Sequence, residues 1–347
     1  MTYLITGAAG HLGNTLAKRL VEDGQRVRGL IQPQESDSPA LPREMEVVTG
    51  NILDPASMEP LFQHEPDEPI TVIHNAGLVS IATKYQQNVY DVNVTGTKNI
   101  LRLCRQNGAV KLVYVSSVHA IPELPMGQII TETKQFDPDK VNGCYAKTKA
   151  AATACVLTAG AKDMDVCIIH PSGLCGPNDY GRGHITQLLI DYCRHSLTSG
   201  VATGGYDFVD VRDVADGVIA AADKGKKGEC YILSNRYIPV RELLNTLSRV
   251  TGGKNITTVL PLWFAKMTAP LAELYYKIRH ESPLFTRYTL YTLTSNARFT
   301  YEKARRDLGY KPRDISTTIK DTVSFLTKER KNLFRKRKIS KPVPVMG

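Results

Sequence analysis

The sequence lacks the long apolar runs that would carry it across a membrane. No stretch approaches the ~18 consecutive apolar residues that a spanning helix requires. The most hydrophobic segment, 260–278, is interrupted by two prolines, Lys266 and Glu273. Residues 1–5 (MTYLI) contain no basic segment, so they do not resemble a secretory signal peptide. We therefore expect a soluble, cytoplasmic protein.

Cysteine is present, but its spacing matches neither a set of disulfide bonds nor a metal site. The seven cysteines are an odd number, and no two of them form a C-x-x-C pair. Several lie in apolar runs, such as Cys167 between Val166 and Ile168. No group of cysteine, histidine and carboxylate residues has the spacing of a metal site. We expect reduced thiols and no metal.

Outside its last twenty residues the chain has little net positive charge. The formal net charge is +10, and residues 328–347 contain eight basic residues and one acid, so residues 1–327 carry only +3. Charge confined to a terminus is typical of a solvated tail, although weak attraction to an anionic membrane surface or to nucleic acid also fits. It does not indicate a specific nucleic-acid partner.

The order of the expected elements is typical of an α/β protein. The 347 residues, 42% of them hydrophobic, suffice for one large α/β unit or two modest domains. In the first half, short segments rich in Val, Ile, Leu and Tyr alternate with helical patterns. Strands are expected at 2–6, 26–31, 46–49, 71–74, 112–116 and 166–170, and helices at 11–23, 87–106 and 145–160. This alternation predicts a Rossmann-type doubly wound parallel sheet.

The second half is less regular and predicts a smaller lobe. Strands are expected at 206–211 and 229–233, and helices at 212–222, 240–251, within 260–278, at 301–308 and at 316–331. We expect residues 1–170 to form the NAD(P)-binding domain, with segments near 206–234 returning to it. Residues 171–327 would form mainly the C-terminal substrate-binding lobe, followed by the basic tail 328–347.

A glycine motif follows the first expected strand and opens the first expected helix. Glycines at positions 7, 10 and 13 allow a tight turn, close approach of the backbone to a pyrophosphate and close packing of helix on strand. The start of the helix adds free N–H groups and a partial positive charge. The motif therefore predicts a dinucleotide site that includes Gly7, Ala9, Gly10, His11, Leu12 and Gly13.

The end of the second expected strand bears on the choice of cofactor. NAD sites usually carry Asp or Glu there, to bind the ribose diol. This strand ends Arg28-Gly29-Leu30-Ile31-Gln32, with no acid before Glu35. Without that carboxylate nothing repels a 2′-phosphate, and Arg28 or Gln32 is placed to contact one. We expect NADP(H) to be favoured over NAD(H).

Tyrosine and lysine occur four residues apart at the start of an expected helix. This spacing puts the side chains of Tyr145 and Lys149 on one helix face. An ammonium group near the phenol favours the phenolate, which lowers a tyrosine pKa toward neutrality and suits it to proton transfer. Ser117 ends the apolar strand 112–116, whose carboxyl end faces the ligand crevice of such a sheet. A serine there can orient a substrate carbonyl or hydroxyl toward Tyr145.

Taken together, these motifs resemble the extended short-chain dehydrogenase/reductase superfamily. The resemblance rests on 6–13 (TGAAGHLG), 93–97 (NVTGT), Ser116-Ser117, the Tyr145–Lys149 pair, 170–177 (HPSGLCGP) and 207–215 (DFVDVRDVA). It extends over about residues 1–327, with His170 standing where the family usually has arginine. Segments 283–286 and 304–312 are most similar to bacterial relatives of dihydroflavonol 4-reductase and 3β-hydroxysteroid dehydrogenase.

The resemblance implies roles for individual residues. Tyr145 would be the general acid/base, Lys149 would lower its pKa and bind the nicotinamide ribose, and Ser117 would orient the substrate. Asn51 and Ile52 would lie beside the adenine, with Asn51 in place of the family's aspartate. The other implied cofactor contacts are Asn75, Ala76 and Gly77 after the fourth strand, and Pro171 and Ser172 near the nicotinamide.

Three functions remain open from the sequence. The first is an oxidoreductase that transfers a hydride between the nicotinamide and a small-molecule ketone, aldehyde or secondary alcohol. The second is a nucleotide-sugar epimerase or dehydratase with tightly bound NAD, although 117–120 (SVHA) lacks the Asp-Glu pair of related dehydratases. The third is a redox-sensing Rossmann protein without catalysis. A homodimer and a substrate-facing role for His119 also stay open.

Overall fold

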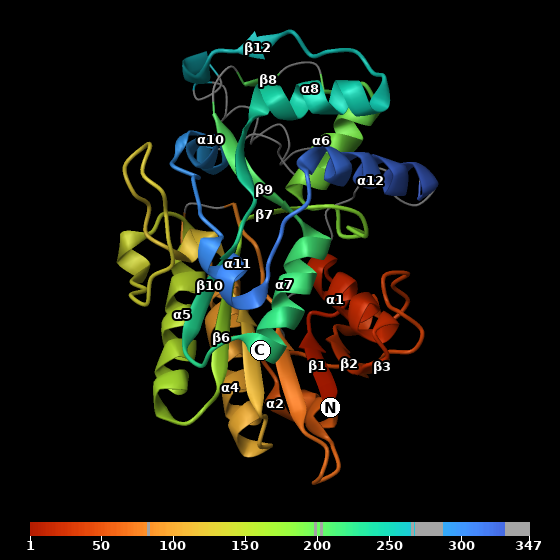
Figure 1. The fold of residues 1–347 in the computed structure, drawn as a ribbon, viewed down its shortest axis with the longest axis vertical. Helices are drawn as coiled ribbons and strands as arrows, with labels where there is room; N and C mark the ends of the chain where they lie inside the picture. Colours follow the sequence, from red (N-terminus) through yellow and green to blue (C-terminus); the bar gives the residue numbers. More distant parts are fainter. Residues whose placement is uncertain (82–83, 198–199, 202–203, 265–266, 268–286, 330–347) are drawn as a thin grey trace.

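The main element of the fold is a seven-stranded, fully parallel sheet (Figure 1). The computed structural model describes residues 1–347 except 82–83, 198–199, 202–203, 265–266, 268–286 and 330–347. The strand order is β10-β6-β5-β4-β1-β2-β3. The strands are β1 (Thr2–Thr6), β2 (Arg26–Ile31), β3 (Glu46–Thr49), β4 (Ile70–His74), β5 (Lys111–Val115), β6 (Val166–Pro171) and β10 (Glu229–Leu233).

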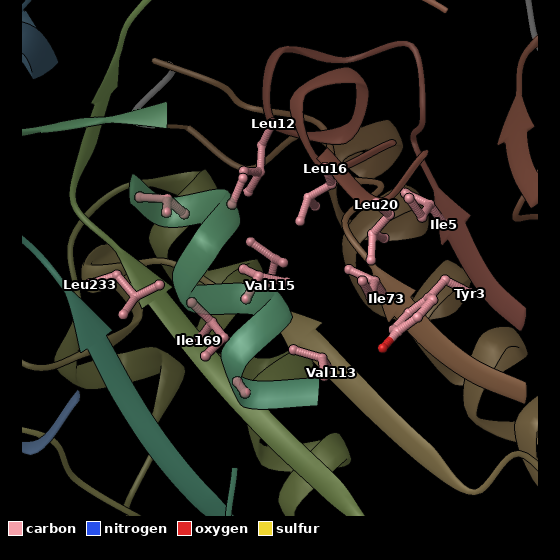
Figure 2. Packing of buried hydrophobic residues seen from close by; sticks show 14 of the residues in the cluster. Tyr3, Ile5, Leu12, Leu16, Leu20, Ile73, Val113, Val115, Ile169 and Leu233 are labelled. Carbon is pink, nitrogen blue, oxygen red and sulfur yellow. The ribbon is translucent and has the colours of Figure 1, made fainter. Parts of the chain in front are cut away.

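Helices cover both faces of this sheet because alternate strand residues point to opposite sides. Tyr3, Ile5 and Val113 point toward α1 (His11–Glu22), α7 (Val211–Lys224) and α11 (Glu302–Leu308), and Figure 2 shows part of this core. Leu4 and Leu112 point to the other face, toward α2 (Pro55–Phe62), α4 (Gly96–Gln106) and α5 (Cys144–Lys162). The doubly wound parallel sheet predicted from the sequence is therefore confirmed.

A second, smaller part of the molecule is built on β7 (Gly173–Cys175), β9 (Gly205–Asp210) and β11 (Arg236–Pro239), in the order β11-β9-β7. Around it lie α6 (His184–Cys193), α8 (Val240–Thr251), α10 (Arg287–Thr294) and α12 (Ile315–Lys328), in the upper half of Figure 1. β8 (Gly200–Val201) pairs with β12 (Val259–Leu260). Leu189, Phe208, Leu247 and Ile319 belong to its separate hydrophobic core.

Most expected elements lie within one or two residues of those observed, but some were missed. The sequence analysis did not predict α2, which contains Pro60 and begins at Pro55 behind the capping residue Asp54. The expected helix 87–106 consists of α3 (Gln87–Tyr90), a π-helical turn (Asp91–Thr95) and α4. The sequence analysis also missed α6, α10, β7, β8, β11 and β12.

Two expectations fall wholly or largely on residues outside the described ranges. These are the helix within 260–278 and all of the basic tail beyond residue 329. β10 pairs with β6 and α7 packs on α1, while the predicted domain boundaries stay a prediction. In the part of the chain that the structure describes, no helix is both long and apolar enough to cross a bilayer.

Candidate active site

The glycine motif forms a tight turn between β1 and α1. Gly7 has a φ of 68°, and a Cβ there would lie 2.9 Å from the Cα of Ala76. A Cβ on Gly13 would collide with the carbonyl oxygen of Gly7. Among the described residues no side chain caps the start of α1, so its first N–H groups lie at the carboxyl edge of the sheet without a side-chain partner. This bare helix start fits the diphosphate of a dinucleotide.

A directed hydrogen-bond chain joins the ends of β1 and β4 beneath this turn. The Thr97 hydroxyl donates to the Asn93 carbonyl at 2.7 Å, so it accepts from His74 Nε2 at 3.0 Å. His74 Nδ1 then accepts from the Thr6 hydroxyl at 2.7 Å, and Thr6 Oγ1 accepts from the Ala76 amide. Burial lowers the pKa of His74 to about 3, with the Lys149 charge adding to it. The imidazole is therefore neutral, and this network holds the turn rigid.

The predicted catalytic residues meet at the carboxyl end of β5. Tyr145 and Lys149 lie one turn apart on α5, and the Ser117 side chain lies close enough to the Tyr145 phenol to lower its pKa. Ser117 Oγ accepts from the His119 amide at 3.2 Å, which leaves the serine proton for donation. The Lys149 ammonium donates to the Val115 carbonyl at 2.8 Å and lies 5.0 Å from the centre of the Tyr114 ring.

Burial dominates the electrostatics of this trio. It raises the pKa of Tyr145 to about 12, against a lowering contribution from the Ser117 hydrogen bond. It also lowers the pKa of Lys149 to about 7. In this structure desolvation outweighs any lowering of the Tyr145 pKa by the ammonium, so the net shift is upward, and the predicted role of Lys149 stays a prediction. Tyr145 is a protonated acid at neutral pH, and Lys149 titrates there.

The sequence analysis cited Asn93 only as part of a motif, without a site role. Asn93 lies in the π-helical turn, a distortion that is frequent at functional sites. Its Oδ1 accepts from the Leu78 amide at 2.8 Å, and its Nδ2 donates to Thr148 Oγ1 at 3.0 Å. Thr148 in turn donates to the Tyr145 carbonyl at 2.9 Å. Asn93 thus ties the loop after β4 to the catalytic helix.

Residues after β4 connect the glycine turn to Lys149. Asn75 Nδ2 donates to the Gly7 carbonyl at 3.4 Å. A Cβ on Gly77 would lie 3.2 Å from Lys149 Nζ, so the backbone there passes close to the ammonium. Asn75, Ala76 and Gly77 therefore lie between the predicted phosphate site and the predicted catalytic pair, as a dinucleotide site requires.

Asn51 and Ile52 lie directly after β3, at the same edge of the sheet. Asn51 Oδ1 accepts from the Leu53 amide at 3.0 Å, so its carboxamide is used within its own turn. Ile52 is buried and packs against Gly96. The contact is close, because a Cβ added to Gly96 would lie 2.6 Å from Ile52 Cδ1. Their predicted contact with the adenine stays a prediction.

Arg28 does not lie where the sequence analysis placed it. It pairs with Leu4 in the middle of β2, two residues before the pairing of Leu30 with Thr6. Its guanidinium forms an ion pair with Glu46 at 2.8 Å and donates to the Leu61 and Gln63 carbonyls at the end of α2. The prediction that Arg28 contacts a cofactor phosphate is therefore wrong, because other elements hold its side chain.

The imidazole of His11 also binds another part of the chain instead of facing the predicted phosphate site. His11 Nε2 hydrogen-bonds the Pro177 carbonyl at 2.9 Å, and Asn14 Nδ2 donates to the Asn178 carbonyl at 3.1 Å. A carbonyl only accepts, so Nε2 carries the proton. Only the His11 backbone N–H, in the first turn of α1, remains for a phosphate. The side chain instead ties the glycine turn to the segment after β7.

Pro171 ends β6, and Ser172 follows it beside a buried carboxylate. Ser172 Oγ donates to Asp207 Oδ1 at 2.5 Å, and the same oxygen accepts from the Asn235 amide at 3.0 Å. Burial raises the pKa of Asp207 to about 6. Neighbouring His170, in place of the family's arginine, donates from Nδ1 to the Ser117 carbonyl at 2.9 Å. His170 therefore helps to hold the serine loop.

Aromatic rings gather beside Tyr145 on the side of the smaller lobe. The His119 ring lies edge-on to Tyr145 with centroids 6.2 Å apart, and it stacks on Tyr206 at 5.7 Å. His119 Nε2 and the Tyr206 hydroxyl are hydrogen-bonded at 3.0 Å. Burial lowers the pKa of His119 to about 4, so the ring is neutral at pH 7. The sequence analysis left His119 open and missed Tyr206.

Comparison with known proteins agrees with this geometry. A family model described as the NAD dependent epimerase/dehydratase family matches residues 3–234, which contain the glycine turn and the Ser117–Tyr145–Lys149 trio. The chain belongs to this family. It is accordingly an NAD-dependent enzyme of the extended short-chain dehydrogenase/reductase type, as the sequence motifs predicted.

Known proteins with related sequences match nearly the whole chain. Sterol demethylase protein B of Methylococcus capsulatus is 29% identical over 330 residues, 94% of this chain and 98% of that protein. The 3 beta-hydroxysteroid dehydrogenase/Delta 5-->4-isomerase of Mycobacterium tuberculosis is 28% identical and covers 89% of this chain and 85% of its own. The crystal structure of gox2253 aligns with a TM-score of 0.80 at 27% identity, covering 95% of this chain and 98% of that one.

In the described residues, no three histidine, cysteine or carboxylate side chains are grouped to hold a metal ion. The seven cysteines are free thiols, and five of them are buried. The donors at the site are thus backbone amides, hydroxyls and one ammonium. These groups suit a dinucleotide and an uncharged oxygen of a substrate.

Proposed function

We propose that this enzyme interconverts a ketone or aldehyde and a secondary or primary alcohol, as a reductase or dehydrogenase. When bound, the nicotinamide supplies or accepts the hydride. The observation that carries the proposal is the placement of partly buried Tyr145 beside buried Ser117 and one helical turn from buried Lys149. Similarity to a hydroxysteroid dehydrogenase supports the same reaction type.

Ser117 and Tyr145 would hold the substrate oxygen between two donors. Ser117 Oγ already accepts from the His119 amide, so its proton is available to the substrate. In reduction Tyr145 gives its proton to that oxygen as charge develops, and in oxidation it removes the proton. Lys149 stabilises the phenolate that remains after donation. The neutral His119–Tyr206 pair borders the space for the rest of the substrate.

For the cofactor we propose NADP(H) over NAD(H). β2 ends in Leu30 and Ile31 and is followed by Gln32, so no acid stands at the usual diol position to repel a 2′-phosphate. Arg28 does not support this choice, because Glu46 and α2 hold it. The kcat/KM ratio for NADPH against NADH tests it directly. We also place the enzyme in the cytoplasm, where its seven reduced cysteines are stable.

The second candidate is an epimerase or dehydratase with tightly bound NAD, which the family description favours. Such an enzyme removes a hydride from the substrate and returns it, so the cofactor shows no net change. Purified protein would then retain NAD and would not oxidise added NADPH or NADH. The two functions therefore differ in a single absorbance measurement.

The proposed function is tested with a panel of ring and chain ketones and either cofactor. Wild-type protein should oxidise one cofactor with at least one ketone. Tyr145→Phe should lower turnover at least about 10³-fold, since the phenol supplies the proton, and should leave cofactor affinity within a few-fold. The matched control is Tyr85→Phe, whose hydroxyl donates to exposed Gln87. Turnover that survives Tyr145→Phe would contradict the acid/base role.

A further inference from the structure

The His119 ring packs against the predicted catalytic tyrosine and, at the same time, against the smaller lobe. Its centroid lies 6.2 Å from that of Tyr145, 5.7 Å from that of Tyr206 on β9 and 6.5 Å from that of Tyr288 on α10. The Tyr206 ring stacks on the imidazole at an interplanar angle of 18°, and its hydroxyl is hydrogen-bonded to His119 Nε2 at 3.0 Å. The stacking fixes the plane of the imidazole, and the hydrogen bond fixes its rotation within that plane.

The backbone of His119 holds the second predicted catalytic side chain, Ser117. His119 lies in a 3₁₀ turn (Val118–Ala120), and its amide donates to Ser117 Oγ at 3.2 Å. The Ala120 amide donates to the Ser117 carbonyl at 3.0 Å. His119 is therefore bonded to Ser117 through its backbone and to Tyr206 through its side chain.

The residues on either side of His119 anchor the turn by apolar packing. Val118 belongs to a buried cluster with Ile130. Ala120 belongs to another with Ala146 and Ala150 on α5, the helix that carries Tyr145 and Lys149. Apolar packing is non-directional, whereas a hydrogen bond sets an orientation. The bond to Tyr206 thus supplies a directional restraint on a turn that packs against the catalytic helix.

The environment of the His119 imidazole suits a fixed group better than a proton carrier. Burial lowers the pKa of His119 to about 4, so the ring is uncharged at neutral pH. Its Nε2 is already hydrogen-bonded to Tyr206, and the ring meets Tyr145 edge-on. A neutral, stacked imidazole holds its neighbours in place without exchanging protons with them.

We propose that His119 is a positioning residue, through which Tyr206 of the smaller lobe orients Ser117 and Tyr145 for reaction. The inference rests on the proposed function, because its expected effect is on turnover of a carbonyl substrate. It goes further by giving the smaller lobe a part in aligning the reacting groups, in addition to its contact with the substrate.

The first test removes the Tyr206 hydroxyl and keeps the stacked ring. Tyr206→Phe should lower kcat for a ketone that the wild type reduces about ten-fold, which corresponds to about 1.4 kcal/mol and to one neutral hydrogen bond. The Kd for NADPH or NADH, measured by fluorescence titration, should stay unchanged. The matched control is Tyr192→Phe, another buried tyrosine of the smaller lobe, whose hydroxyl donates to the Lys254 carbonyl at 2.9 Å. The control should leave both quantities unchanged.

A double-mutant cycle tests whether the two side chains act through one bond. His119→Phe keeps an aromatic ring against Tyr145 and removes the nitrogen that bonds Tyr206. It should match Tyr206→Phe, and the double variant should also lose only about ten-fold in kcat, because both substitutions remove the same bond. A loss of about a hundred-fold in the double variant would mean that the side chains act independently, and would overturn the proposal.

Amide hydrogen exchange, followed by NMR on the full chain, reports on the serine turn without turnover. In Tyr206→Phe the His119 amide should exchange about ten-fold faster, because the turn opens more often, and in Tyr192→Phe it should not change. Unchanged exchange in Tyr206→Phe, or faster exchange without a loss in kcat, would overturn the proposal. If the wild type reduces no ketone, the hydride-transfer proposal fails, and the exchange rates alone decide whether Tyr206 holds the serine turn through His119.

Discussion

At the scale of residues, Lys149 is a predicted catalytic group whose charge changes with pH near neutrality. Burial brings its pKa down to about 7, while the pKa of Tyr145 is raised to about 12. The phenol therefore stays protonated through the working range. The ammonium, by contrast, is lost as pH rises through 7. Any step that needs the positive charge should follow this titration.

We predict that kcat/KM for ketone reduction falls as pH rises through about 7, since kcat/KM reports groups of the free enzyme. Lys149→Met should lower kcat/KM at pH 6 at least about 10²-fold and should remove this descending limb. Lys147→Met is the matched control, because Lys147 is two residues away and pairs with exposed Asp139. A descending limb that persists in Lys149→Met would contradict the assignment.

The residues of the site were predictable to different degrees. Ser117, Tyr145 and Lys149 could be placed because a strand end and a four-residue helical spacing fix where their side chains point. Arg28 could not, because a strand residue chooses its partners from neighbouring elements, here Glu46 and the end of α2. The raised pKa of Tyr145 also depends on its burial in the folded chain, which the four-residue spacing does not reveal.

At the scale of elements, the start of α1 is the most tightly constrained junction. A Cβ on Gly13 would collide with the Gly7 carbonyl and come within 2.9 Å of the Ala8 Cα, and both obstacles are backbone. The helix would have to move away from β1. Its first N–H groups would then leave the position from which they can bind a diphosphate.

We therefore predict that Gly13→Ala lowers the free energy of unfolding by about 1–3 kcal/mol and weakens cofactor binding at least ten-fold. Urea unfolding and cofactor titration measure the two effects. Gly24→Ala, at the other end of α1, is the control: its Cβ meets nothing within 4 Å, although its φ of 72° favours glycine. That variant should lose about 1 kcal/mol and keep its cofactor affinity. Unchanged affinity in Gly13→Ala would contradict the phosphate-binding role.

Elements were predictable where hydrophobic periodicity and boundaries agree, as in the strands of the large sheet. The helix α2 was not, because Pro55 and Pro60 break the pattern that marks a helix, although a proline suits its first turn. Short strands such as β7 and β11 were missed because three or four residues carry too little periodicity. They form through pairing with β9, which is a tertiary effect.

At the scale of the whole molecule, buried Asp207 joins the two parts of the fold. From β9 it accepts from Ser172 after β6 and from Asn235 after β10. Its pKa is raised to about 6, so the folded protein binds its proton more tightly than the unfolded chain. The free energy of unfolding therefore falls as pH rises from about 4 to 6, because the folded protein loses its tightly bound proton. Above pH 6 the buried Asp207 carboxylate makes the protein about 3 kcal/mol less stable than it is with Asp207 protonated.

We predict that Asp207→Asn becomes more stable relative to wild type as pH rises from 4 to 7, by about 1–3 kcal/mol. Urea unfolding at pH 4, 5, 6 and 7 measures this difference. Asp139→Asn is the control, because the Asp139 side chain is 91% exposed and its curve should run parallel to wild type. If the free energy of unfolding of Asp207→Asn also changes with pH in parallel with wild type, the Asp207 carboxyl of the wild type titrates with an ordinary pKa.

The central claim, net hydride transfer to a substrate carbon, is tested most directly with deuterium. Wild-type protein is incubated with a reactive ketone and NADPH or NADH deuterated at C4, and the product alcohol is analysed by mass spectrometry. Our account predicts one deuterium on the carbinol carbon for each cofactor oxidised, and none with Tyr145→Phe. No alcohol product and no consumption of added cofactor, with NAD found already bound to the purified protein, would contradict it and indicate the epimerase.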